Sequence, residues 1–165
     1  MSVTKDLLKE LIEESVITRK MLERIPADKY DWRPHVKSMN ITQLAGHIAE
    51  LPGWVSMAFT MDGLDFAQHA YVAPVWNNRE ELMKIFEDAL SGANTQLQLA
   101  ADEQLNKQWI LRNGSQILAD LTTGGMARLA LSQTIHHRAQ LGVYLRLLDI
   151  PIPGTYGPSA DDQGF

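Results

Sequence analysis

The sequence predicts an all-α domain built as a four-helix bundle. Four segments of about 18 to 25 residues repeat apolar residues at the period of an amphipathic helix. The chain has 165 residues, which suits one domain over residues 1–165 with a sizeable core. The sequence contains no internal repeat at a fixed period and no low-complexity run. These observations favour one bundle over a multidomain chain.

The first two helices are predicted over about residues 3–24 and 41–59. Asn40 precedes the second helix as a candidate N-cap, and Gln43 stands three residues later, where a capping-box partner belongs. Pro52 lies inside this helix and lacks the amide that would donate to a preceding carbonyl. We therefore expect a kink in the second helix.

A long loop is expected over residues 61–76, followed by the third helix over about residues 78–100. An Asn-Gly pair at 113–114 separates two apolar runs, which predicts a short hairpin near residues 109–118. The fourth helix is predicted over about residues 126–148 and ends before two prolines.

Charge and composition exclude several classes of protein. The net charge of -5 argues against a nucleic-acid partner. The sequence has no run of 18 consecutive apolar residues, so we expect no membrane span. The polar N-terminus does not resemble a secretory signal. The absence of cysteine removes disulfides and thiolate ligands, and it fits a cytoplasmic protein. A metal site in this chain would therefore use imidazole, carboxylate, amide or water.

Polar residues interrupt the apolar faces of the second and fourth helices. His47 stands at a core position of the second helix, and Gln133 and His137 are four residues apart on the inner face of the fourth. The functional interpretation is a divalent metal held by His47, His137 and Gln133, with water at the open positions. Such an ion would lower the pKa of its water to around 7. The alternative is that the same side chains are buried and hydrogen-bonded to one another.

The remaining histidines are weaker candidates. His136 points about 100° away from His137 around the helix. It is either a second-layer group or proton carrier, or a residue on the helix flank. His35 and His69 lie in connecting segments, and loop histidines are usually solvated.

Several segments resemble motifs of the DinB-like family, also described as YfiT-like metal-dependent hydrolases. The resemblance covers most of the chain, and the fourth-helix motif together with the tail is its most specific part. The matching segments are Asp-Trp-Arg-Pro-His at 31–35, Leu-Ala-Gly-His-Ile-Ala at 44–49, His-His-Arg-Ala-Gln-Leu at 136–141 and Tyr-Gly-Pro-Ser-Ala-Asp at 156–161.

The resemblance implies an up-down-down-up bundle that forms a homodimer. It also implies a metal triad of one histidine on the second helix and a His-x-x-x-His pair on the fourth. His47 and His137 match two of these places, whereas Gln133 stands where the family has its other histidine. Zinc or nickel is the expected ion. The departure at Gln133 leaves open a site that holds no metal.

The family's known activities imply an enzyme that acts on a small molecule, either as a hydrolase or as a transferase with a thiol cosubstrate. The walls of its pocket are expected to include Trp54, Tyr144 and the tail at 156–162. The alternative is a non-enzymatic dimeric bundle whose degenerate metal site binds a small ligand or a partner.

Overall fold

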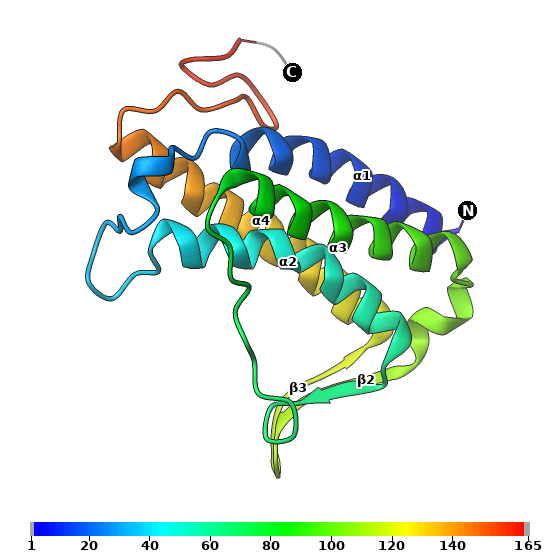
Figure 1. Cartoon of the computed structure of the whole chain (residues 1–165). Helices are drawn as coiled ribbons and strands as arrows, with labels where there is room; N and C mark the ends of the chain where they lie inside the picture. The colour runs from blue at the N-terminus through cyan, green and yellow to red at the C-terminus, as the bar shows by residue number, and fades with distance from the viewer. Residues whose placement is uncertain (1, 164–165) are drawn as a thin grey trace.

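Four long helices form a bundle in the computed structural model, which describes residues 2–163 (Figure 1). Each helix begins and ends within three residues of its predicted range. Two short 3₁₀ helices, η1 (Ala27–Lys29) and η2 (Asp102–Asn106), lie in the connections. The four helices are α1 (Val3–Leu22), α2 (Ile41–Thr60), α3 (Arg79–Leu99) and α4 (Thr123–Leu147).

The helices α1 and α4 run in one direction along the bundle, and α2 and α3 run in the other (Figure 1). Both α1 and α2 pack against α3 and α4. The inner faces of α2 and α4 therefore meet inside the bundle, which is where His47 and His137 lie.

The predicted all-α class is wrong in one respect, because a three-stranded sheet stands at one end of the bundle (Figure 1). The hairpin expected at 109–118 is longer, with β2 (Gln108–Asn113) antiparallel to β3 (Gln116–Thr122). The segment expected to be a loop at 61–76 contains the third strand, β1 (Gly63–Asp65), which pairs with β2 in parallel.

The sheet depends on two glycines. A Cβ atom at Gly63 would lie 2.3 Å from the carbonyl oxygen of Ile110, so only glycine allows β1 to approach β2 this closely. Gly114 has φ of 59° and opens the two-residue turn between Asn113 and Gln116. A positive φ at the first turn position alone is the pattern of a type II′ hairpin turn.

The start of α2 is fixed by the expected capping box. The Asn40 side chain accepts from the Gln43 amide at 2.8 Å, and the Gln43 side chain accepts from the Asn40 amide at 3.0 Å. The helix continues through Pro52 to Thr60. Half of the residues of α2 are buried, and they include positions on the core side and beside the site described below.

The C-terminal segment is attached to α1 and α4. Tyr156 donates to the buried Glu14 carboxylate at 2.7 Å and accepts from Arg138 at 2.9 Å. Arg138 also donates to Glu14 at 2.6 Å, and this guanidinium is almost fully buried. The tail therefore crosses the α1–α4 side of the bundle, on the opposite side from the sheet (Figure 1). Among the described helices, none has the length and apolar character needed to cross a membrane.

Candidate functional site

The structure brings His47 of α2 and His137 of α4 together. Their ring centroids are 4.8 Å apart, and the ring planes meet at 76°. Two imidazoles bound to one ion, with metal–nitrogen distances of about 2.1 Å and angles of about 90–110°, have ring centres roughly 4.5–5.2 Å apart. The observed separation therefore fits a shared ion.

One nitrogen of each ring already has a partner on its own helix. His47 Nδ1 lies 2.7 Å from Glu50 Oε1, and His137 Nδ1 lies 2.8 Å from Gln140 Oε1. Carboxylate and amide oxygens accept hydrogen bonds, which favours protonation of Nδ1 in both rings. The lone pair is then on Nε2 in each case. Metal-binding histidines are commonly oriented by such a partner on the other nitrogen.

His137 is suited to remain neutral at physiological pH. Burial lowers the pKa of its imidazole below the ordinary value, although the hydrogen bond with Gln140 opposes the effect. The nearby rings of His47 and His136 lower the pKa further. A neutral imidazole is the form that binds a metal.

Gln133 lies one turn before His137 on α4 and is half-buried. It lines the same cavity as His47, which has a volume of about 230 Å³. Within residues 2–163, its amide makes no side-chain hydrogen bond, so the oxygen and the NH₂ group are both available. The same residues contain no group of three or more His, Cys, Asp or Glu side chains that could hold an ion. A third protein ligand beside the histidines would therefore be the Gln133 amide.

Glu50 and Tyr71 belong to this site, and the sequence analysis missed both. Tyr71, in the segment between β1 and α3, donates to Glu50 Oε1 at 2.5 Å. Burial raises the pKa of its hydroxyl, and the Glu50 carboxylate raises it further, so the phenol stays protonated. Glu50 follows His47 by three residues, which places both on one helix face. That spacing was a readable signal for Glu50, whereas nothing in the sequence placed Tyr71.

Other expected site residues lie elsewhere. Trp54 lines the cavities beside His47, as predicted. Tyr144 instead packs against Trp32, with ring centroids 5.5 Å apart, and the predicted wall at 156–162 lies against α1 and α4. These two predictions of the pocket walls are therefore wrong.

The other histidines take secondary places. His136 is exposed, and its Nε2 lies 3.1 Å from the Gln140 amide nitrogen, so Gln140 connects it to His137. His35 is exposed and accepts from the Lys37 amide. His69 lies beside the sheet and does not join the pair.

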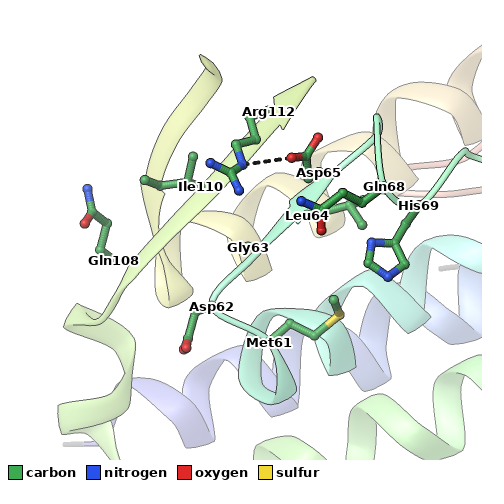
Figure 2. A pocket seen from close by; sticks show the side chains of 10 residues that line it. All are labelled: Met61, Asp62, Gly63, Leu64, Asp65, Gln68, His69, Gln108, Ile110 and Arg112. Atoms are coloured by element: carbon green, nitrogen blue, oxygen red, sulfur yellow. Dashed lines mark ion pairs between the residues drawn. The ribbon is translucent and has the colours of Figure 1, made fainter. Parts of the chain in front are cut away.

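A larger cavity of about 580 Å³ lies between the end of α2 and strands β1 and β2 (Figure 2). Its principal ion pair joins Asp65 and Arg112 at 3.1 Å, drawn as a dashed line in Figure 2. The Asp65 carboxylate also accepts from the amides of Gly114 and Ala67. The hydrogen bond from Gly114 is the main reason that the pKa of Asp65 is lowered. These contacts of Asp65 hold the hairpin to β1.

The fold and the site together define a helical-bundle protein with a polar histidine pair between two core helices. The family model described as the DinB family matches residues 1–163, and the chain belongs to this family. No curated protein matches the chain.

Several solved structures share the fold of this chain. A DinB-like protein from Bacillus cereus is 17% identical, with a TM-score of 0.72 over 92% of this chain and 97% of its own. A DinB-like protein from Bacillus subtilis is 19% identical, with a TM-score of 0.68 over 89% and 96%. A mycothiol-dependent maleylpyruvate isomerase is 11% identical, with a TM-score of 0.60 over 84% of this chain and 60% of its own.

Proposed function

We propose that the chain is a metal-dependent enzyme that acts on a small molecule, by hydrolysis or by transfer with a thiol cosubstrate. The proposed ligands of the divalent ion, zinc or nickel, are His47, His137 and Gln133. The observation that carries the proposal is the histidine pair, 4.8 Å apart, with both Nδ1 atoms already engaged. When bound, the ion would make water or a thiol acidic enough to react near neutral pH.

The surrounding residues have distinct roles in this proposal. Glu50 holds the His47 ring through Nδ1, and the hydroxyl of Tyr71 donates to the same carboxylate. Tyr71, Trp54 and Phe66 also line an open cavity that contacts His47, so three aromatic side chains form part of the entrance to this histidine. The substrate therefore approaches between α2 and the segment that follows β1.

The thiol-dependent version has support from one structural neighbour. The mycothiol-dependent maleylpyruvate isomerase shares the fold and uses a thiol, as its name states. The absence of cysteine from this chain means that any thiol would come from a cosubstrate.

A non-enzymatic dimeric bundle is the second candidate. The amide at Gln133 favours it, because an amide oxygen is a weaker ligand than imidazole for zinc or nickel. In this case the same polar pair would bind a small ligand or a partner without catalysis.

Metal analysis separates the two candidates. Protein purified without chelators should carry, or take up, about one equivalent of zinc or nickel per chain. Saturation at about one hundred times the Kd should stabilise the fold by roughly 2.7 kcal/mol. His47→Ala should abolish both effects, whereas His35→Ala, at an exposed histidine outside the site, should leave them unchanged.

A protein that takes up no ion and shows no thermal shift would refute the enzyme proposal. Gln133→His should strengthen metal binding, because it supplies a third imidazole. Activity of the loaded protein on small ester and amide substrates, with and without an added thiol, would then distinguish hydrolysis from transfer.

A further inference from the structure

The cavity beside His47 is largely apolar. It extends from His47 and Gln133 between α2, α4 and the hairpin, and it has a volume of about 230 Å³. Its apolar walls are Leu51, Trp54, Leu111, Met126, Leu129 and Ala130. A group that enters this space loses contact with water on most sides, which favours hydrocarbon over charge.

The size of the cavity limits its occupant. A cavity of about 150 Å³ lined by aliphatic and aromatic side chains is large enough for benzene. The space beside His47 is larger, so it accommodates a benzyl group or a branched chain of similar bulk.

Besides the indole N–H of Trp54, the polar side chains of the lining are His47 and Gln133. His47 Nδ1 is engaged by Glu50, which leaves Nε2, and the Gln133 amide has a free oxygen and a free NH₂ group. An occupant with one hydrogen-bonding group next to its apolar body would satisfy this amide, whereas a pure hydrocarbon would leave it unpaired.

A second cavity of about 450 Å³ shares His47 and Trp54 with the first and opens toward solvent. Its other lining residues are Phe66, Ala70, Tyr71 and Asn113. Neither lining contains Lys or Arg. Away from the proposed ion, a carboxylate or phosphate of the substrate would therefore meet no cationic side chain in either cavity.

We propose that the inner cavity binds the apolar end of the substrate, an aryl or branched alkyl group that carries a neutral hydrogen-bonding group next to the NH₂ group of Gln133. This substrate class rests on the function proposed above. The outer cavity then holds the remainder of the substrate or the cosubstrate.

Benzyl alcohol and toluene are matched probes that differ in one hydroxyl group. Their binding to chelator-treated protein is measured by titration with ¹⁵N- and methyl-detected NMR. Benzyl alcohol should bind with perturbations centred on Leu129, Ala130 and Gln133. It should bind up to about tenfold more tightly than toluene, because its hydroxyl pairs with the Gln133 amide. Gln133→Leu should reverse this preference, because it replaces the amide by hydrocarbon.

Leu129→Phe should weaken benzyl alcohol binding about tenfold or more, because it fills part of the cavity. Leu99→Phe is the matched control, since Leu99 is exposed at the end of α3. Two results with the wild-type protein would overturn the inference: chemical-shift perturbations that lie away from the cavity, or equal affinity for benzyl alcohol and toluene. Both are measured on the wild-type protein, so they do not depend on whether a variant folds.

The metal is titrated separately. Zinc binding without binding of benzyl alcohol would refute the substrate class and keep the metal proposal. Binding of benzyl alcohol without zinc binding would refute the metal enzyme and support the cavity as a ligand site.

Discussion

Replacing Glu50 with alanine removes the group that orients His47. The carboxylate accepts from His47 Nδ1 at 2.7 Å, and its second partner is the hydroxyl of Tyr71. Without Glu50, the ring is free to rotate and to exchange its tautomer, so Nε2 no longer faces the proposed ion with a fixed lone pair. We expect Glu50→Ala to weaken zinc binding.

Two estimates give the same size for this effect. Loss of a partner that orients a metal ligand typically costs about 10–100-fold in metal affinity, or roughly 1.4–2.7 kcal/mol. A hydrogen bond to a charged group contributes about 1.5–3 kcal/mol. The side chains of His47 and Glu50 are 22% and 17% exposed, so water replaces the lost partner only in part. Glu50→Gln keeps an acceptor oxygen and should recover part of the affinity.

Competition with a chromophoric chelator would measure zinc affinity for each variant, and urea unfolding would show whether the fold is retained. The ¹⁵N shifts of the imidazole of His47 in metal-free protein report its tautomer, which a purely structural role for Glu50 would not change. Glu80→Ala provides the control, because Glu80 is exposed at the start of α3. Zinc affinity of Glu50→Ala within about threefold of wild type, below the expected range, would refute the reasoning.

Three further predictions concern stability and assembly. Arg138→Met leaves the Glu14 carboxylate buried without its cation, so urea unfolding should show a loss of about 3–5 kcal/mol; a loss below about 1 kcal/mol would contradict this. Asp102 accepts hydrogen bonds at the start of α1, which lower its pKa from 3.8 to about 2. The ionised carboxylate stabilises the fold fully above the unfolded pKa of Asp102, and this stabilisation is lost as the pH falls through the folded pKa. The difference in unfolding free energy between wild type and Asp102→Asn should therefore narrow between about pH 4 and pH 2. A difference that stays constant over this range would contradict the prediction. Val143 and Leu147 are exposed one turn apart on α4, and we propose this apolar face as the contact of the expected homodimer. Val143→Glu should then give a monomer in light scattering, whereas Val75→Glu, at an exposed valine in a loop, should not.

The helices could be predicted because their signals are local. Apolar periodicity located all four, and the Asn40–Gln43 capping box fixed the start of α2 to the residue. The Asn-Gly pair located the hairpin for the same reason, since the turn requires a positive φ at Gly114.

The third strand could not be predicted in this way. Leu64 of β1 pairs with Leu111 of β2, far away in sequence, and β1 contains only three residues. A segment this short carries no periodicity, and glycine, the residue type at position 63, is uncommon in strands. Glycine is required at position 63 because the carbonyl of Ile110 lies against it, and this contact forms only after the chain has folded.

The site shows the same division between local and distant signals. The inward positions of His47 and His137 followed from the faces of their helices, and the structure places the two rings side by side. The partner of His137, Gln140, lies three residues away and was also readable. Tyr71 reaches the site from a loop whose path no local pattern specifies. The prediction that the tail lines the pocket is wrong, because the buried pair of Glu14 and Arg138 holds Tyr156 on the other side of the bundle.

Gln133 connects the two proposals made for this site. An imidazole in this place would bind an ion through one nitrogen, and its other nitrogen would point away from the ion. An amide can bind an ion through its oxygen while the NH₂ group remains free to donate to a substrate. It also keeps this donor and acceptor at every pH near neutrality, unlike histidine. Because the Gln133 amide lines the apolar cavity with His47, we infer that the departure from a third histidine exchanges metal affinity for recognition of a neutral ligand.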